Sequence, residues 1–192
     1  MRIITGRYRG RRLAGPPAPG LRPATDRVRE SVFNILQNRL DISGIRVLDL
    51  FAGTGSLGFE ALSRGAGEVT FVDADRHATA LIGKNAGALG CADHCEIITQ
   101  DAAGFLSGIN GIFQLIFVDP PYDYGRTGEL PRLVFSSGIL DAGGYLIVEH
   151  RRGTAFETAC PPDAVFTRRF GNTEVTFFHH PPPTNQKERH RA

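Results

Sequence analysis

The chain has 192 residues, 41% of them hydrophobic and 22% charged, a composition typical of a folded protein of about one 150-residue domain with a short appendage. No apolar run approaches the roughly 18–20 residues that cross a bilayer, and the N-terminus has no signal-peptide pattern, so we expect a cytoplasmic protein. Three cysteines, an odd count, fit a reducing compartment better than a disulfide framework.

The net charge of +2 conceals a basic N-terminal end. Residues 1–29 carry eight arginines and a single acidic residue, Asp26, so the rest of the chain is net acidic. This asymmetry indicates a polyanionic partner that is met mainly at one end of the molecule. Arginine suits such a partner because its planar guanidinium binds phosphates through paired hydrogen bonds and stacks on bases.

The N-terminal part of the sequence predicts short elements. Residues 2–13 predict a pair of short strands punctuated by Gly6 and Gly10, and the cluster GPPAPG at 15–20 predicts a linker. Apolar residues then recur at helical spacing from Val28 to Leu36, so we expect an amphipathic helix over residues 26–39.

From residue 45 onward, predicted strands and helices alternate. The strands span 45–50, 68–73, 95–99, 113–119 and 145–150, and the helices span 57–64, 75–89, 102–107 and 127–136. Continuous apolar strands joined by helices indicate a parallel sheet covered on both faces. Residues 165–170 and 173–180 flank a Gly171-Asn172 turn, so the sheet should end in an antiparallel hairpin. Residues 181–192 are rich in proline and polar residues, and we expect a disordered tail there.

A glycine-rich loop follows the first of these strands. Gly53, Gly55 and Gly58 match the pattern G-x-G-x-x-G between a strand and a helix, and Asp73 ends the next strand. This arrangement satisfies the nucleotide-binding fingerprint in which the acidic residue binds a ribose hydroxyl, so NAD is a candidate ligand.

Two further aspartates favour S-adenosylmethionine over NAD. Asp49 lies at the strand end before the glycines, where its carboxylate would repel a pyrophosphate but suit the ammonium of a methionine moiety. Asp101 follows a third strand and can accept a hydrogen bond from an adenine amino group. The carboxyl ends of parallel strands share one sheet edge, so Asp49, Asp73 and Asp101 should gather there. A single aspartate at such a place is most often a helix N-cap, and Asp75 and Asp101 could each be only that.

The segment FVDPPY, residues 117–122, carries the most specific signal in the chain. Asp119 ends an apolar strand on the same sheet edge as the glycine loop. Pro120 and Pro121 fix the backbone and remove two amide donors, which leaves the Pro120 carbonyl as a rigid acceptor beside the Asp119 carboxylate. Tyr122 adds an aromatic face. Two acceptors and a stacking ring can hold the exocyclic amino group of a nucleobase and direct it at a sulfonium methyl group.

Several segments together resemble one known family. VDPPY is typical of class I S-adenosylmethionine-dependent methyltransferases that act on base amino groups. RIITGRYRGRRL, LRPATDRVRESVFNIL, VLDLFAGTGSLGFEALSRGA and FGNTEV resemble the bacterial family that methylates guanine N2 in 16S ribosomal RNA. The resemblance covers residues 1 to about 180 and implies a Rossmann-like α/β fold with a mostly parallel seven-stranded sheet. It also implies one target guanine, position 966 in the usual count, methylated during small-subunit assembly.

The resemblance implies a role for each matching residue. The methionine and ribose end of S-adenosylmethionine would lie against Asp49, Phe51, Ala52, Gly53 and Gly55, its ribose hydroxyls against Asp73, where the family more often has glutamate, and its adenine against Asp101 and Ala102. The target guanine would be held by Asp119, Pro120, Pro121 and Tyr122.

The charge pattern predicts how the chain is divided and where RNA binds. We expect Arg7, Arg9, Arg11, Arg12, Arg22 and Arg27 to contact RNA. Residues 1–24 would form an RNA-docking extension that the catalytic sheet does not need in order to fold. Residues 25–180 would form the methyltransferase domain, followed by the tail at 181–192.

Three alternatives remain open at this point. A DNA adenine-N6 methyltransferase would share the DPPY segment but usually needs a larger target-recognition domain. A non-catalytic RNA-binding assembly factor could keep the fold, although an intact DPPY speaks against it. The third alternative, an NAD-linked oxidoreductase, is disfavoured by Asp49.

Cys91, His94 and Cys95 supply too few ligands for structural zinc, so we expect no metal. The expected protein is a monomer whose partner is 16S rRNA, the small ribosomal subunit or its assembly intermediate.

Overall fold

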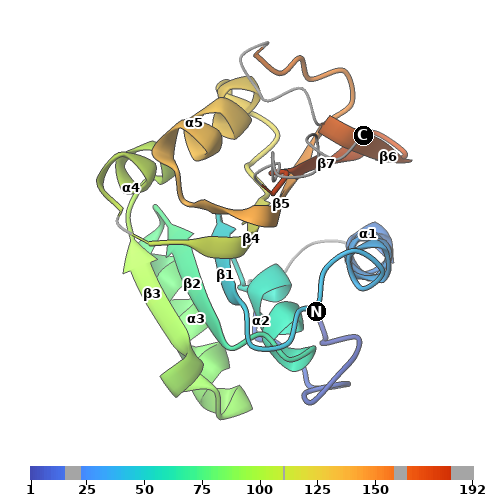
Figure 1. The fold of residues 1–192 in the computed structure, drawn as a ribbon. Helices are drawn as coiled ribbons and strands as arrows, with labels where there is room; N and C mark the ends of the chain where they lie inside the picture. The colour runs from blue at the N-terminus through green and yellow to red at the C-terminus, as the bar shows by residue number, and fades with distance from the viewer. Residues whose placement is uncertain (16–22, 110, 158–163, 183–192) are drawn as a thin grey trace, which may run out of the picture.

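The computed structural model describes residues 1–15, 23–109, 111–157 and 164–182 (Figure 1). Its strands are β1 (Arg46–Leu50), β2 (Glu68–Asp73), β3 (Cys95–Thr99), β4 (Phe113–Val118), β5 (Leu140–Arg151), β6 (Ala164–Phe170) and β7 (Thr173–His179). Its helices are α1 (Pro23–Leu36), α2 (Ser56–Ser63), α3 (Arg76–Leu89), α4 (Ala102–Gly108) and α5 (Leu130–Ser137), with 3-10 turns η1 (Ala92–His94) and η2 (Thr127–Glu129).

The strands form one sheet in the order β3-β2-β1-β4-β5-β7-β6. β1 pairs in parallel with β2 and β4, β2 with β3, and β4 with β5, whereas β7 pairs antiparallel with both β5 and β6. The predicted seven-stranded sheet with a terminal hairpin is therefore confirmed. The strand order reverses between β1 and β4, and open sheets bind ligands at the carboxyl ends of the strands beside such a switch point.

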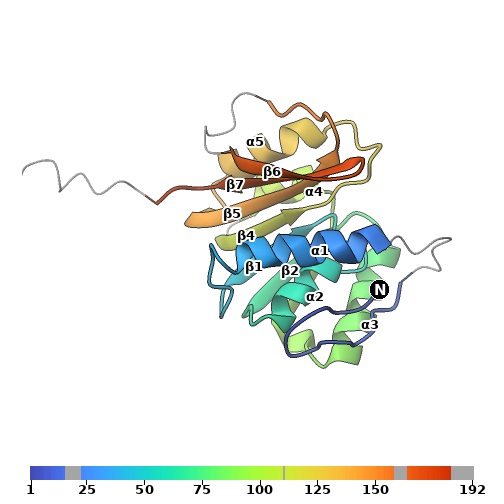
Figure 2. The same ribbon diagram turned by 90° about the vertical axis from the view of Figure 1, so that its right-hand side faces the viewer.

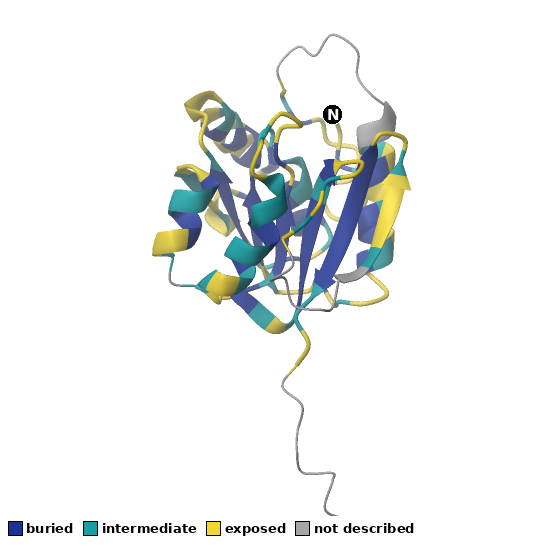
Figure 3. Ribbon diagram, turned by 90° about the horizontal axis from the view of Figure 1, so that it is seen from above, coloured by how far each residue is buried: buried dark blue, intermediate teal, exposed yellow. Residues whose placement is uncertain are grey.

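Helices cover both faces of the sheet (Figures 1 and 2). Helices α1, α2 and α3 pack on one face, and α4 and α5 pack on the other. In β1, Val47 belongs to the first of these two apolar cores and Leu48 to the second, because side chains alternate across a strand. Figure 3 shows the buried strands between the helical layers. Burial on both faces explains why the strands are continuously apolar in sequence.

The N-terminal segment packs against α1 and α2 and belongs to the first core. Ile3, Tyr8 and Leu13 are all buried in that core. The backbone amide of Ile4 donates to the carboxylate of Glu60, a fully buried residue of α2, at 2.8 Å. The expectation that the sheet folds without this segment stays a prediction, and this packing is the reason to test it.

The strand pair predicted over residues 2–13 is a compact loop with one antiparallel bridge, between Arg2 and Arg12. Gly6 and Gly10 have φ values of 86° and 80°, in the left-handed region that glycine adopts without strain. The prediction of two regular strands is therefore wrong, because the chain turns sharply at both glycines.

Several predicted boundaries also differ from the structure, among them the start of the helix predicted over 127–136, where the 3-10 turn η2 precedes α5. α1 begins at Pro23 and ends at Leu36, earlier at both ends than the predicted span 26–39. The early start is possible because proline is well tolerated in the first helical turn, where amides have no helical partner. β5 begins at Leu140, ahead of the predicted residue 145. Of the predicted tail, residues 183–192 lie outside the described residues. In the described part of the chain, no helix has both the length and the apolar character to cross a membrane.

Candidate active site

A cleft of about 640 Å³ opens at the carboxyl ends of β1, β2, β3, β4 and β5. It is lined by Phe51, Gly53, Val72, Asp73, Ala74, Asp75, Gln100, Asp101, Ala102, Asp119, Pro120, Pro121, Tyr122, Tyr124 and Glu149. Nine of the twelve residues predicted to bind cofactor or base are among them. The other three, Asp49, Ala52 and Gly55, lie behind the lining.

The glycine loop bends tightly between β1 and α2. The amide of Gly53 donates to the Asp73 carboxylate at 2.8 Å, and Gly55 has a φ of 77°. Gly58 lies in α2 where a Cβ atom would be 2.3 Å from the Phe71 ring. The absence of a side chain at Gly58 therefore lets α2 approach β2 closely, which brings the loop to the edge of the cleft.

Asp49 supports this loop from behind. Its side chain is only 1% exposed, and its carboxylate accepts a hydrogen bond from the Gly58 amide at 2.9 Å. Burial raises the pKa of Asp49 well above its usual range. In this structure the Asp49 carboxylate binds the backbone of the loop. Its contact with a methionine ammonium stays a prediction.

Three further aspartates, Asp73, Asp75 and Asp101, line the cleft and also bind backbone amides. Asp73 accepts from Gly53 and, through its other oxygen, from the amide of Asp75 at 2.9 Å. Asp75 caps α3 and Asp101 caps α4, where it accepts from the Gly104 amide at 2.9 Å. Asp75 and Asp101 therefore do both: each is a helix N-cap, and each also lines the cleft.

The DPPY segment leaves β4 and turns across the mouth of the cleft. The amide of Tyr124 donates to the Pro121 carbonyl at 2.8 Å, and in the described residues no backbone donor meets the carbonyl of Pro120. The Tyr122 ring is 50% exposed, and its hydroxyl hydrogen-bonds to the hydroxyl of Thr173 on β7. The Tyr122 ring is thus held by a hydrogen bond close to the Pro120 carbonyl, and the predicted roles of both groups in binding a base stay predictions.

Glu149 is the acidic residue that the sequence prediction missed. Val118 of β4 pairs with Val148 of β5, so Asp119, which directly follows β4, lies beside Glu149, which is still inside β5. Both line the cleft, and both also line a smaller cavity of about 80 Å³ beneath α1. The signal that singled out the other aspartates, a carboxylate at the end of an apolar strand, was also present in YLIVEH.

The surroundings of Asp119 and Glu149 oppose ionisation of both groups. Asp119 is exposed at the cleft, yet desolvation by the protein around it raises its pKa to about 6. Burial, and secondly the charge of Asp119, raise the pKa of Glu149 to about 8. Two adjacent carboxylates therefore share this part of the cleft, and ligands that donate hydrogen bonds to both would favour their ionised forms.

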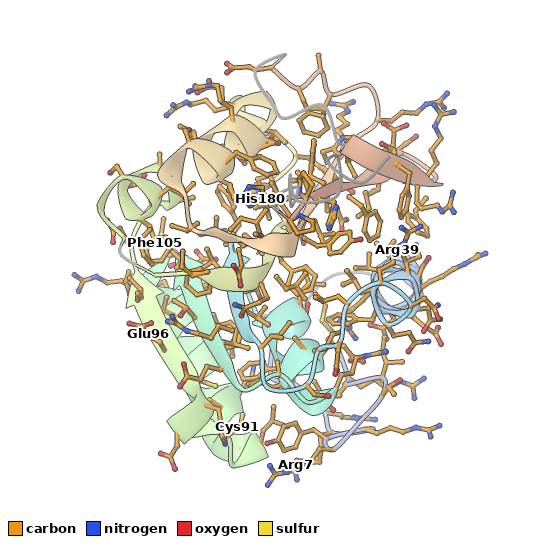
Figure 4. The ribbon with its side chains drawn as sticks, in the orientation of Figure 1. Arg7, Arg39, Cys91, Glu96, Phe105 and His180 are labelled. Atoms are coloured by element: carbon orange, nitrogen blue, oxygen red, sulfur yellow. The ribbon has the colours of Figure 1, made fainter. Side chains whose placement is uncertain are left out.

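The predicted RNA-binding arginines do not form one group. Arg7, Arg9, Arg11 and Arg12 are exposed on the N-terminal loop, Arg27 is exposed on α1, and Arg22 lies outside the described residues. The Arg7 amide donates to Ser63 at the end of α2, and the Arg11 guanidinium donates to the carbonyl of Ala88 near the end of α3. Both helices run back from the cleft, so Arg7 and Arg11 lie toward the end of the sheet opposite the cleft, and Figure 4 labels Arg7 there.

The cysteine–histidine segment has structural contacts of its own. His94 Nδ1 lies 2.9 Å from the Gly67 carbonyl, and the Cys95 thiol donates to the Cys91 carbonyl. Across the described ranges, no group of three or more His, Cys, Asp or Glu side chains is placed to hold a metal ion.

Comparisons with known proteins give the following matches. The family model described as "Conserved hypothetical protein 95" matches residues 1–179. Ribosomal RNA small subunit methyltransferase D of Escherichia coli (strain K12) is 40% identical over 149 residues, which cover 78% of this chain and 74% of that protein. YlbH of Bacillus subtilis (strain 168) is 36% identical, over 93% of this chain and 98% of that protein. The solved structure of yhhF from Escherichia coli matches with a TM-score of 0.81 and 34% identity, covering 95% of this chain and 98% of that chain.

Proposed function

The chain belongs to the bacterial family of S-adenosylmethionine-dependent ribosomal RNA methyltransferases described as "Conserved hypothetical protein 95", and on that premise we propose that it methylates the N2 amino group of a guanine in 16S rRNA. Position 966 is the proposed target, and small-subunit assembly the proposed setting. The observation that carries the proposal is the carboxylate pair Asp119 and Glu149 beside the Tyr122 ring in one cleft.

The cleft lining fits a cationic cofactor. Its acidic residues are Asp73, Asp75, Asp101, Asp119 and Glu149, and within the described residues it includes no lysine or arginine. Such a wall repels the pyrophosphate of a dinucleotide and attracts ammonium and sulfonium groups. When bound, S-adenosylmethionine supplies an electrophilic methyl group on its sulfonium sulfur.

We assign the cofactor contacts to the β1–β3 side of the cleft. Asp73 would bind the ribose hydroxyls, because its carboxylate already lies at the glycine loop. Asp101 and Ala102 would meet the adenine, and Phe51 and Gly53 the methionine and ribose end. Asp49, Ala52 and Gly55 would act from behind by fixing the loop.

Replacing Asp73 with alanine should weaken binding of S-adenosylhomocysteine by about 10-fold to 100-fold, because hydrogen bonds to a charged group contribute roughly 1.5–3 kcal/mol. Titration calorimetry measures the effect, and S-adenosylhomocysteine isolates binding from turnover. Asp93→Ala is the matched control, since Asp93 is exposed on η1 and should leave binding unchanged. Equal affinities in all three proteins would refute the assignment.

The β4–β5 side of the cleft would hold the base. Asp119 and the Pro120 carbonyl accept the two hydrogens of the amino group, while Tyr122 stacks on a base that has left its helix. As the amino nitrogen bonds to the methyl group, the methyl–sulfur bond breaks with its electron pair left on sulfur, and the nitrogen becomes positive. The Asp119 carboxylate stabilises this charge. The surplus proton leaves to Asp119 or to solvent, and no covalent enzyme intermediate is required.

Glu149 favours guanine as the base. Guanine carries an N1–H donor beside its N2 amino group, so an ionised Glu149 next to Asp119 can accept from N1 while Asp119 accepts from N2. Adenine carries a lone pair at N1, and only a protonated Glu149 could donate to it. The two bases thus require opposite protonation states of one side chain.

The pH dependence of the reaction should therefore identify the base. For guanine, kcat/KM should rise as Asp119 and Glu149 ionise, through pH values near 6 and near 8, and then level off. Glu149→Gln should remove the upper rise and keep the lower one. For adenine, activity should fall above about pH 8, because Glu149 loses the required proton. Rates with 16S rRNA across this range, in wild type and variant, decide between these outcomes.

A further inference from the structure

A groove of about 410 Å³ runs between α1 and β6, outside the cleft. It is lined by Arg27, Glu30, Ser31, Asn34, Ile35, Asn38, Arg39, Phe166 and Arg168. The arginines Arg27, Arg39 and Arg168 are exposed, and Figure 4 shows Arg39 on this side of the molecule. In the part of the chain that the structure describes, none of the three forms an ion pair with a carboxylate. The groove therefore offers free positive charge and one acidic side chain, Glu30.

The aromatic ring of Phe166 lines the groove and positions two of these guanidinium groups. Arg39 lies over the Phe166 ring at 4.7 Å from its centre, and Arg168 lies over it at 5.1 Å. The ring itself stacks on the buried Phe177, with centroids 4.6 Å apart. Guanidinium planes held in this way can stack on unpaired bases and bind phosphates at the same time.

The groove runs along α1, which covers the β4–β5 side of the cleft, where the nucleobase would bind. Val28 and Val32 of α1 line the small cavity that also includes Asp119 and Glu149. Arg27 and Ser31, the neighbours of those two residues in sequence, line the groove. A strand that leaves the cleft over α1 would enter the groove at Arg27, whereas Arg7 and Arg11 lie toward the end of the sheet opposite the cleft.

We propose that the α1–β6 groove, and not the tip of the N-terminal loop, binds the single-stranded RNA that flanks the target base. This inference rests on the proposed function and names the surface that recognises its substrate. Arg27, Arg39 and Arg168 bind phosphates, and the guanidinium groups of Arg39 and Arg168 over Phe166 also receive an unpaired base. Sequence alone pointed to the N-terminal arginines because they are more numerous there, although the tip of the N-terminal loop, at Arg7, packs at the end of α2 that lies away from the cleft.

The test compares two double variants that each remove two positive charges. Arg39→Gln with Arg168→Gln should weaken binding of a 16S rRNA fragment several-fold at low salt and make the slope of log K against log salt shallower by about 1.4. Arg7→Gln with Arg9→Gln should change neither quantity. Phe166→Leu keeps an apolar side chain, and it should weaken binding without changing the slope. Melting temperature and S-adenosylhomocysteine affinity should match wild type in the groove variant.

Each outcome has a distinct meaning. If wild type methylates rRNA but the groove variant binds it with unchanged affinity and slope, the inference falls and the proposed function stands. Loss of affinity only in the Arg7/Arg9 variant would also overturn the inference. If the groove variant binds naked RNA normally and loses affinity only for assembled small subunits, the groove contacts a protein and the inference is wrong. If wild type methylates duplex DNA and not rRNA, the proposed function and the inference both fall.

Discussion

Asp119→Ala should lower methyl transfer to 16S rRNA at least about 100-fold and leave cofactor binding intact. The variant removes the acceptor that orients the amino group and the charge that stabilises the developing cation. Asp119 follows β4, whereas the proposed cofactor contacts follow β1, β2 and β3, so the binding site for S-adenosylhomocysteine should survive. Single-turnover rates and titration calorimetry measure the two properties separately.

Two further variants make this result specific. Asp119→Asn keeps a carbonyl acceptor without the charge, and we expect activity between wild type and alanine. Tyr122→Ala should act mainly on capture of the base, because stacking contributes roughly 1–3 kcal/mol per base. Near-normal turnover in Asp119→Ala would show that the amino group is held elsewhere, and the mechanism would be wrong.

Deleting residues 1–15 should unfold the protein or lower its melting temperature strongly. Ile3, Tyr8 and Leu13 are buried in the first core, and burial of each such side chain stabilises a fold by roughly 1.5–3 kcal/mol. The loss is comparable to the whole stability of a domain, about 5–15 kcal/mol. Circular dichroism during heating of the truncated and full-length chains measures the difference.

The hydrogen bonds of this segment add to the expected loss. Its amides at Ile4 and Thr5 donate to the Glu60 carboxylate, and the Ala14 amide donates to the Asn85 side chain at 2.8 Å. Arg9→Gln in the full-length chain is the control, because that exposed side chain should not affect melting. A truncated protein that melts like wild type would contradict this prediction and support the expectation that residues 1–24 form an independent extension.

The sequence predicted the sheet well because its signals are local. A strand buried on both faces must be continuously apolar, and each predicted strand from residue 45 onward overlaps a strand of the structure. The ends of parallel strands share one edge, so the positions of Asp73, Asp101 and Asp119 around one cleft also followed from their places in sequence. The predicted helix ends were less accurate, because the spacing of apolar residues in α1 does not show where the helical hydrogen bonds begin.

Long-range packing could not be predicted in the same way. Gly6 fits against α2 so closely that a Cβ atom there would lie 1.8 Å from the Ser63 carbonyl oxygen. The sequence around Gly6 does not predict this contact. The same packing places Arg7 and Arg11 toward the end of the sheet opposite the cleft. The number of arginines in residues 1–29 had predicted an RNA-docking site there. The contact of Arg39, which follows α1, with Phe166 of β6 joins two segments that are far apart in sequence.

Identification of the modified nucleoside tests the central claim most directly. The full-length protein is incubated with methyl-labelled S-adenosylmethionine and, separately, with naked 16S rRNA, assembled small subunits and duplex DNA, and the products are digested and analysed by mass spectrometry. The account predicts label in N2-methylguanosine from one position of 16S rRNA, in the naked RNA or the particle. N6-methyladenosine from DNA, or no label in any substrate while the protein binds the cofactor, would contradict it.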